Sequence, residues 1–292
     1  MFRKLTSVIK LLRVQHYVKN LFIYLPLFFV GNFTNIDLLI LSSIAFIGFS
    51  MFASSIYIIN DLVDVENDKN HPSKKNRPIA AGKINFFEAI LLIFILLLSG
   101  SFLINSISFT ALQVCFIYFF MNLAYTFKLK QKSIIDVSLI SFGFVLRILV
   151  GSIVTDTPLS NWIIVLTFLL ALFLALGKRR DDVLIFIDSG KKMRKSVDGY
   201  SLQFIDSSML ILASVIIVSY ILYSVSFNSE IRLNSEYLYL SSVFVVFGIL
   251  RYLQIVFIDK NSGSPTKILL KDQFTIINLI LWIISFLVIL YF

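Results

Sequence analysis

Four carboxylates lie close together in residues 60–68, which read NDLVDVEND. Asp61, Asp64 and Asp68 are spaced by three and four residues, so on a continuous helix they share one face. Like charges this close repel one another, and a bound cation relieves the repulsion. Mg²⁺ suits hard oxygen ligands and usually binds a few carboxylates together with substrate phosphates. A solvated acidic helix end, balanced by the neighbouring lysines, is the competing interpretation, and this stretch alone supports the two about equally.

A second charged cluster occupies residues 177–182, which read GKRRDD, and is followed by further basic residues at 191–195. Lys178 and Asp182 are one helical turn apart, and Arg179 or Arg180 offers a guanidinium fork that suits phosphate. Basic runs beside a membrane also serve topology or bind anionic lipid, and that alternative stays open. Two clusters that combine carboxylates with cations on one membrane face indicate a shared metal and polyphosphate site, with a diphosphate as a substrate.

One arginine lies near the middle of an apolar stretch. Arg147 follows Asp136 in the run 133–154, and an intramembrane arginine normally faces a polar cavity or an anionic partner. Phosphate binding and a structural ion pair carry equal weight for Arg147. Arg251 lies nearer the end of its own apolar run, where a long side chain can reach the interface, so a structural role is favoured there.

Other common sites have no support in the sequence. His16 and His71 are far apart and have no second soft ligand, so zinc is not indicated. The G-x-x-x-x-G-K-[ST] pattern of P-loop nucleotide hydrolases is absent. Cys115, the single cysteine, lies in an apolar run, which predicts a buried small hydrophobic residue and excludes an intrachain disulfide.

The elements that must position these residues are membrane helices. Hydrophobic residues make up 58% of the 292 residues and charged residues 15%, against about a quarter charged in soluble domains. A shorter segment at 17–30 contains Asn20 and Pro26; a cleavable signal peptide is its alternative interpretation, and a retained first helix is expected. With it, an all-α fold of nine transmembrane helices is predicted. Eight apolar runs have spanning length: 36–59, 87–105, 107–127, 133–154, 160–177, 207–227, 236–258 and 272–292.

The distribution of the basic residues along the chain tests the predicted number of spans. Of the 26 lysines and arginines, all but three fall in segments on one side of the membrane; Arg147 and Arg251 lie within spans, and Arg232 lies in an opposite loop. The positive-inside rule therefore places the N-terminus and both charged clusters in the cytoplasm, at the cell membrane, with the C-terminus outside. The net charge of +9 reflects this orientation, and nucleic acid is not expected as a partner. Residues 1–292 are expected to form one domain with cytoplasmic cap loops 60–86 and 178–206.

The motifs resemble a known family. The pattern Asn60-Asp61-x-x-Asp64-x-x-x-Asp68 at the end of a second helix looks like the first aspartate motif of the UbiA-type prenyltransferase superfamily. The run HPSKKNRPIAAG at 71–82 is similar to the branch called decaprenyl-phosphate phosphoribosyltransferases. Further matches to that branch cover nearly the whole chain: QHYVKN at 15–20, GFVLR at 143–147, GKR at 177–179 with Asp182, GSP at 263–265 and LKD at 270–272. Two positions depart from the branch, which commonly has glutamate at Asp182 and often tryptophan near Tyr17.

The resemblance implies a ring of nine helices around a central cavity, with a polar cytoplasmic cap and a lateral opening to lipid. It also implies a set of site residues. The implied metal ligands are Asn60, Asp61, Asp64, Asp68 and Asp182, of which the four aspartates are also the catalytic residues. The predicted substrate-binding residues are Lys19, Asn60, Lys74, Arg77, Lys178 and Arg179, together with Arg147 and Tyr200.

The reaction that the resemblance implies is Mg²⁺-dependent transfer of a 5-phosphoribosyl group from phosphoribosyl pyrophosphate to a polyprenyl phosphate in the membrane. Pyrophosphate is the leaving group. Prenyl transfer from a prenyl diphosphate to an aromatic acceptor is the alternative reaction, disfavoured by the 71–82 run. A transporter or lipid-binding protein with an acidic cation site is a weaker alternative, since the spans hold few deep charges and show no convincing repeat. A homo-oligomer is compatible with the sequence.

Overall fold

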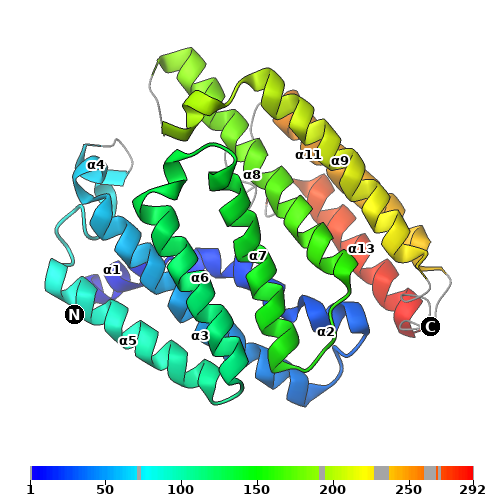
Figure 1. Cartoon of the computed structure of the whole chain (residues 1–292), viewed down its shortest axis with the longest axis horizontal. Coiled ribbons are helices and arrows are strands. Elements are labelled where there is room, and N and C mark those ends of the chain that lie inside the picture. Colours follow the sequence, from blue (N-terminus) through cyan, green and yellow to red (C-terminus); the bar gives the residue numbers. More distant parts are fainter. Residues whose placement is uncertain are drawn as a thin grey trace. The chain divides into compact units, whose positions relative to one another are not determined.

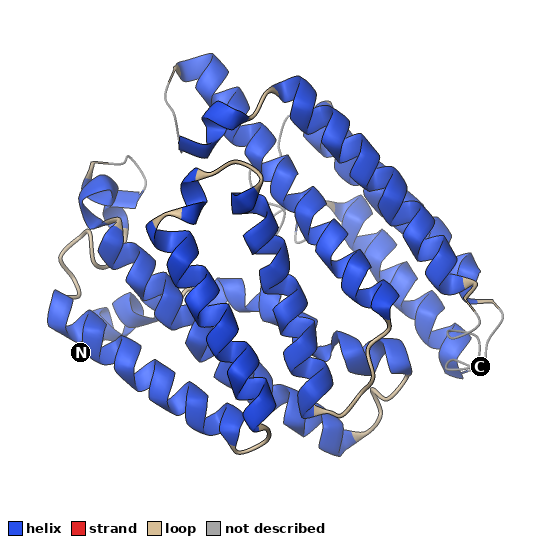
Figure 2. Ribbon diagram, in the orientation of Figure 1, coloured by secondary structure: helices blue, strands red, loops and turns tan. Residues whose placement is uncertain are grey.

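The computed structural model describes residues 2–70, 74–190, 195–226, 237–259, 268 and 271–291. All regular elements within these ranges are helices (Figure 2). The contacts divide the chain into two compact units, and each is described by itself. The first unit comprises Met1–Leu129 and Leu146–Leu159; the second comprises Lys130–Val145 and Ser160–Phe292. Whether the chain forms one domain, as expected, stays a prediction.

The first unit is built around the long helix α3 (Figure 1). Gly100 of α5 allows α5 to pack closely on α3, because an added Cβ there would lie 3.0 Å from the carbonyl oxygen of Gly48. The apolar core between these elements includes Phe49 and Phe52 of α3. The unit contains α1 (Phe2–Leu12), η1 (Val14–Tyr24), α2 (Leu25–Val30), α3 (Ile36–Val63), α4 (Val65–Lys69), η2 (Lys74–Asn76), α5 (Phe86–Asn105), α6 (Phe109–Phe127) and the second half of α7 (Ile135–Val154).

The second unit packs its helices around the pair α8 and α9. Its core includes Phe173 of α8 and Met209 of α9, which are fully buried. The unit contains the first half of α7, then α8 (Asn161–Ser189), η4 (Lys195–Gly199), α9 (Leu202–Ser224), η5 (Leu238–Ser241), α11 (Ser242–Phe257) and α13 (Gln273–Tyr291). The short η3 (Leu129–Gln131) lies where the chain passes from one unit to the other.

The apolar helices make this a multi-pass membrane protein. Seven helices of the described residues are long and apolar enough to cross a bilayer: α3, α5, α6, α7, α8, α9 and the continuous segment Leu238–Phe257. All seven coincide with predicted spans. The eighth predicted span corresponds to α13, of which Gln273–Ile289 counts as a shorter apolar helix. The all-helical membrane fold is thus confirmed, and the count of nine spans stays a prediction.

The segment expected to form one helix at 17–30 is instead broken. Residues Val14–Tyr24 form a 3-10 helix, and a short α-helix follows over Leu25–Val30. Pro26 has no N–H with which to continue an α-helical hydrogen-bond pattern to Phe22. The N–H of Leu25 donates to the Phe22 carbonyl instead, which is the tighter 3-10 pattern. The expected first helix is therefore divided into a 3-10 part and a short α-helical part, and its crossing of the membrane stays a prediction.

The two segments predicted as cap loops, 60–86 and 178–206, both begin with helical residues. Helix α3 continues past residue 59 to Val63 and is followed directly by α4. Helix α8 continues past residue 177 to Ser189, so the second charged cluster lies on a helix. Asn161–Ser189 has 29 residues, which at about 1.5 Å per residue exceeds the thickness of the apolar part of a bilayer, about 30 Å. The last turns of α8 therefore extend its charged residues beyond the apolar layer.

Candidate functional site

The first acidic cluster lies in the first unit, where α3 meets α4. Asp61 and Asp68 are each only 2% exposed, while Asp64 at the junction is partly buried. The N–H of Asp64 donates to the Asn60 carbonyl at 3.0 Å, and the N–H of Asp68 donates to the Asp64 carbonyl at 2.9 Å. These bonds keep the helical spacing across the junction. Asp61 and Asp68 consequently approach the same partner, as their spacing predicted.

That partner is Arg77. Its Nη1 donates to Asp61 Oδ1 at 3.1 Å and to Asp68 Oδ2 at 2.6 Å. Arg13 adds a second guanidinium, with Nη2 2.5 Å from Asp61 Oδ1. Buried carboxylates are costly unless they are paired, and the two arginines supply this pairing. The solvated acidic helix end that competed with a site is therefore excluded for Asp61 and Asp68, although it describes Glu66, which is exposed and pairs with Lys69.

The donor atoms at this cluster fit a magnesium ion. Asn60 Oδ1 is buried and has no hydrogen-bond partner among the described residues, and it belongs to the residue directly before Asp61. No group of three or more His, Cys, Asp and Glu side chains lies close enough to hold a metal within the described ranges. Mg²⁺ does not require such a group, because it keeps several waters and binds one or two protein carboxylates plus substrate phosphates. Asp61 and Asp68, with the amide oxygen of Asn60, match that partial ligand set.

The other predicted cations of this unit lie on the 3-10 helices. Lys19 is on η1 and Lys74 on η2, and both are partly buried. Their assignment to donor phosphates stays a prediction. Within the 71–82 run, His71, Pro72 and Ser73 lie outside the described residues, as do Lys191, Lys192, Arg194, Arg232, residues 263–265 and Leu270.

Arg147 lies in a polar contact network inside the first unit. It is 5% exposed; its Nε donates to Asn20 Oδ1 at 2.8 Å, and its Nη2 donates to the Tyr118 hydroxyl at 3.0 Å. Asn20 in turn donates to Ser50 Oγ at 2.8 Å. The guanidinium carbon also lies 4.9 Å from the ring centroids of Phe49 and Tyr118, a cation–π geometry. Arg147 thus connects α7 to η1 and α6.

A tight backbone contact fixes η1 against α7 one helical turn beyond Arg147. A Cβ added to Gly151 would lie 2.0 Å from the carbonyl oxygen of Ile23. Since both groups are backbone, no side-chain rotation could relieve that clash. The glycine therefore sets the distance at which Asn20 meets Arg147.

The second charged cluster is organised by Arg179 in the second unit. Arg179 is 1% exposed, and its Nε lies 2.7 Å from Asp136 Oδ2. Its Nη1 also donates to Asp182 on the next turn of α8. Asp136 is fully buried and accepts hydrogen bonds from the Tyr200 hydroxyl at 2.8 Å and from Ser196 Oγ at 3.3 Å. The network joins α7, α8, η4 and the residue that follows η4.

Tyr200 is held in its protonated form. Burial raises the pKa of its hydroxyl, and the neighbouring Asp136 carboxylate raises it further. The hydroxyl donates to Asp136 and accepts from the backbone N–H of Ile134 at 2.7 Å. Tyr200 was predicted to bind substrate; in the structure, its hydroxyl orients the carboxylate that pairs with Arg179.

The remaining cations of the second cluster, Lys178 and Arg180, have different surroundings. Lys178 is exposed on α8, and Asp182, one helical turn further along, is bound by Arg179. Arg180 is 8% exposed; its Nε donates to Asp206 at 2.7 Å, and its Nη1 donates to the Val256 carbonyl at 2.8 Å. Arg180 therefore connects α8 to α9 and α11.

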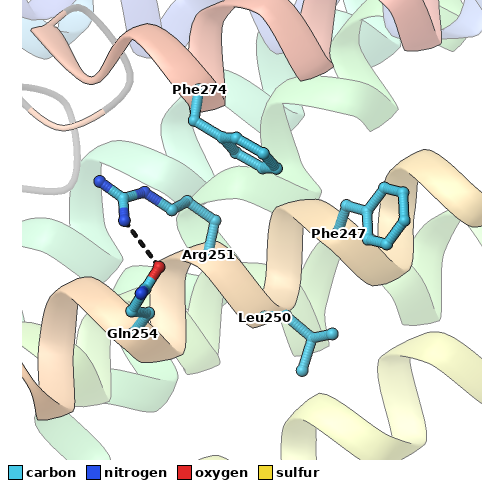
Figure 3. A pocket seen from close by; sticks show the side chains of 5 residues that line it. All are labelled: Phe247, Leu250, Arg251, Gln254 and Phe274. Carbon is cyan, nitrogen blue, oxygen red and sulfur yellow. Dashed lines mark hydrogen bonds between the residues drawn. The ribbon is translucent and has the colours of Figure 1, made fainter.

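Arg251 forms a separate pair near the end of its helix. Its Nε and Nη2 donate to the two carboxylate oxygens of Asp272 at 3.2 and 2.6 Å, and its Nη1 donates to Gln254 at 2.6 Å. This guanidinium holds the pKa of Asp272 well below its ordinary range. The structural role favoured for Arg251 agrees with this geometry. Figure 3 shows the pocket beside it, about 500 Å³, lined by Phe247, Leu250, Arg251, Gln254 and Phe274.

Several partners of the site residues were not predicted. Arg13 was expected only to contribute to the basic charge on the cytoplasmic side, yet it contacts Asp61, which lies 48 residues further along the chain. Asn20 and Tyr118 were not connected with Arg147, nor was Asp206 with Arg180. These contacts link distant segments and leave no local spacing pattern. One signal was available for Asn20, a polar residue inside an apolar segment, which requires a buried polar partner. Cys115 is buried and unpaired, as predicted.

Comparison with known proteins places the chain in a family. The model of the UbiA prenyltransferase family matches residues 20–279. A decaprenyl-phosphate phosphoribosyltransferase from Mycolicibacterium smegmatis is 32% identical over 95% of this chain and 90% of the relative. The protein of that name from Corynebacterium glutamicum is 30% identical over 95% of this chain and 84% of its own length.

The fold agrees with these relatives. A solved structure of a UbiA homologue from Archaeoglobus fulgidus, bound to GPP and Mg²⁺, has a TM-score of 0.71 at 18% identity, covering 98% of this chain and all of the homologue. With the family model matched over most of the chain, with relatives of the expected branch, and with an all-helical membrane fold, the protein belongs to the UbiA prenyltransferase family.

Proposed function

We propose that the protein transfers a 5-phosphoribosyl group from phosphoribosyl pyrophosphate to a polyprenyl phosphate in the membrane. The observation that carries the proposal is the similarity to decaprenyl-phosphate phosphoribosyltransferases over 95% of the chain. The buried Asp61 and Asp68 and the half-buried Arg77 support it, because they converge within the stretch that resembles this branch.

In the proposed reaction, the bond between ribose C1 and the pyrophosphate oxygen breaks, and pyrophosphate leaves with the electron pair. A lipid phosphate oxygen forms the new bond to C1. Bound Mg²⁺ would supply neutralisation of the leaving pyrophosphate. The acceptor phosphate is already anionic, so the reaction needs no general base, and neither histidine is assigned a role.

The site residues of the first unit have two proposed roles, metal binding and phosphate binding. Asp61 and Asp68, with Asn60, would hold the metal, and Asp64 at the α3–α4 junction would complete the acidic set. Arg77, Lys74 and Lys19 would bind donor phosphates. Arg147 is proposed as a further substrate contact through its network with Asn20 and Tyr118.

The second unit contributes a separate proposed set. Asp182 would ligate metal or stabilise the positive charge that develops at ribose C1 as the leaving group departs. Lys178, which is exposed on α8, is proposed to bind donor phosphate. Arg179 is proposed to act on the donor together with Asp182, whose carboxylate it holds, and Tyr200 to support that arrangement through Asp136. The proposed setting is the cell membrane, with these residues facing the cytoplasm.

One assay tests the reaction. The purified protein in detergent, given Mg²⁺, phosphoribosyl pyrophosphate labelled in the ribose and a polyprenyl phosphate, is expected to produce a labelled lipid. A chelator added beforehand should abolish the transfer. The proposal is wrong if label never enters the lipid while a prenyl diphosphate is consumed with an aromatic acceptor, since that outcome identifies prenyl transfer.

A further inference from the structure

A second polar pocket lies in the first unit, apart from the acidic cluster. It has a volume of about 770 Å³ and lies between α1, the segment that follows η2, and the first turn of α5. Its polar lining includes Lys4, Ser7, Lys10, Lys83, Asn85 and Glu88. Neither Asp61, Asp68 nor Arg77 lines it. The proposed reaction therefore does not account for this pocket.

The charges of the pocket leave a positive surplus. Glu88 is matched by Lys4, whose Nζ lies 2.5 Å from Oε1, and its other oxygen accepts from the backbone N–H of Asn85 at 3.1 Å. Lys10 and Lys83 are exposed, and no hydrogen bond or ion pair of either ammonium occurs within the described residues. Two uncompensated positive charges thus border one cavity, which lies at the N-terminal, positive end of the 20-residue helix α5.

The two helices that contribute to the pocket, α1 and α5, also carry exposed apolar residues. On α1, Leu5 and Ile9 are 57% and 48% exposed and share one helical face. Phe86 and Phe87, which begin α5, are 61% and 82% exposed. Amphipathic helices place such faces in the boundary between headgroups and acyl chains, and aromatic residues gather at the same level. Helix α1 and the start of α5 lie side by side (Figure 1), and their exposed apolar residues are of the kind found at the level of lipid headgroups.

We propose that this pocket binds the phosphate of an anionic phospholipid headgroup. Lys10 and Lys83 would neutralise the phosphate, and the side-chain hydroxyl and amide groups of the lining would hydrogen-bond its oxygens. The exposed apolar residues of α1 and of the start of α5 would contact the acyl chains. These contacts favour a lipid over a soluble phosphate, which could use only the polar part of the site. The inference does not depend on the proposed transferase reaction.

Native mass spectrometry of the full-length protein in detergent tests this assignment. Phosphatidylglycerol is expected to remain bound in preference to phosphatidylcholine with the same acyl chains. The double variant Lys10→Gln/Lys83→Gln should reduce phosphatidylglycerol binding on the order of tenfold, because each lysine near a membrane surface contributes substantially to anionic lipid binding. The matched control Lys75→Gln/Lys128→Gln removes the same charge from exposed positions outside the pocket and should retain the lipid.

Thermal unfolding provides a second readout. Phosphatidylglycerol should raise the unfolding temperature of the wild type and of Asp61→Asn, but not that of the pocket variant; Lys83→Gln alone serves if the double variant does not fold. Equal lipid retention by the pocket and control variants overturns the proposal. So does stabilisation by inorganic phosphate, through the same lysines, as large as that by phosphatidylglycerol, because the pocket would then be a soluble phosphate site.

Discussion

Asp61 and Asp68 show how two neighbouring carboxylates can be paired in a nearly inaccessible place. Each is 2% exposed, and both are bound by the same nitrogen of Arg77. The guanidinium compensates for the lost hydration that burial would otherwise cost. The exposed Glu66 of the same run has only a surface pair, of the kind that contributes little to stability. Burial therefore separates the functional candidates from an ordinary surface charge.

The replacements Asp61→Asn and Asp68→Asn test the proposed metal ligands. Each is expected to lower Mg²⁺-dependent transfer by on the order of a hundredfold or more, because an amide binds Mg²⁺ far less well than a carboxylate. Steady-state rates and unfolding temperatures should be measured together, so that lost turnover is assigned to folded protein. Glu66→Gln is the matched control and should keep near-normal activity. Equal losses in all three variants would remove Asp61 and Asp68 from the metal site.

Arg147→Leu separates the two roles considered for that side chain. The buried Asn20 and Tyr118 would each lose a hydrogen-bond partner, and an unsatisfied buried polar group costs about 1–3 kcal/mol. A clearly lowered unfolding temperature in detergent is therefore expected. The proposed substrate contact additionally predicts a raised KM for the donor in the folded variant, and an unchanged KM would leave Arg147 with the structural role alone.

At the scale of elements, polar pairs near helix ends connect the helices of each unit. Arg180 joins α8 to α9 and α11, and Arg251 of α11 joins the segment that begins α13 through Asp272. Asp272 also accepts from the N–H and hydroxyl of Thr275, so it caps the helix that follows. These two pairs lie where charged side chains can reach the interface, whereas Arg147 forms its contacts within the apolar run of α7.

The Asp272 contact predicts a pH dependence of stability. Its pKa in the folded protein is lowered below the ordinary value of 3.8, first by the hydrogen bond from Arg251. A lowered pKa stabilises the folded state fully above the unfolded pKa, and that contribution is lost as the pH falls towards the folded pKa. Asp272→Asn should therefore unfold at a lower temperature than wild type near pH 6, with a difference that shrinks below about pH 4.

The control for this measurement is Asp188→Asn, which alters an exposed aspartate of the same unit. Its unfolding temperature should follow that of the wild type across the same pH range. A difference between wild type and Asp272→Asn that stays constant from pH 6 to pH 3 would show that the Asp272 carboxylate is not responsible.

At the scale of the whole molecule, the length of the apolar runs explains why the membrane helices could be predicted. Runs of about 20 apolar residues have few alternatives to membrane helices, so seven predicted spans coincide with helices. The break at η1 was harder to predict, although Pro26 and Asn20 were its signals. The helical positions of Asp61 and Asp68 followed from their spacing. The pairing of Arg13 with Asp61, and that of Asp136 with Arg179, could not be predicted, because pairing between distant segments depends on packing that no local pattern records.

The orientation of the chain gives a whole-molecule prediction. Helix α5 is long and apolar enough to cross the membrane, so we expect Lys75 before it and Ser106 after it to lie on opposite sides. In a Cys115→Ala background, Lys75→Cys should react with an impermeant thiol reagent only from the cytoplasmic side, and Ser106→Cys only from outside. Labelling in intact cells and in inverted vesicles measures this. The reverse pattern would invert the proposed orientation, and labelling of both from one side would mean that α5 does not cross.

The bridge from Arg77 to Asp61 and Asp68 has a consequence for the order of ligand binding. The Arg77 guanidinium already provides a positive charge to these two carboxylates. A metal ion can therefore bind the same carboxylate oxygens only by displacing the guanidinium. A donor polyphosphate would favour that exchange, because it offers the displaced arginine a new anionic partner. Binding of Mg²⁺ and donor should therefore be synergistic: the metal alone binds weakly, and each ligand strengthens the affinity for the other by the same factor.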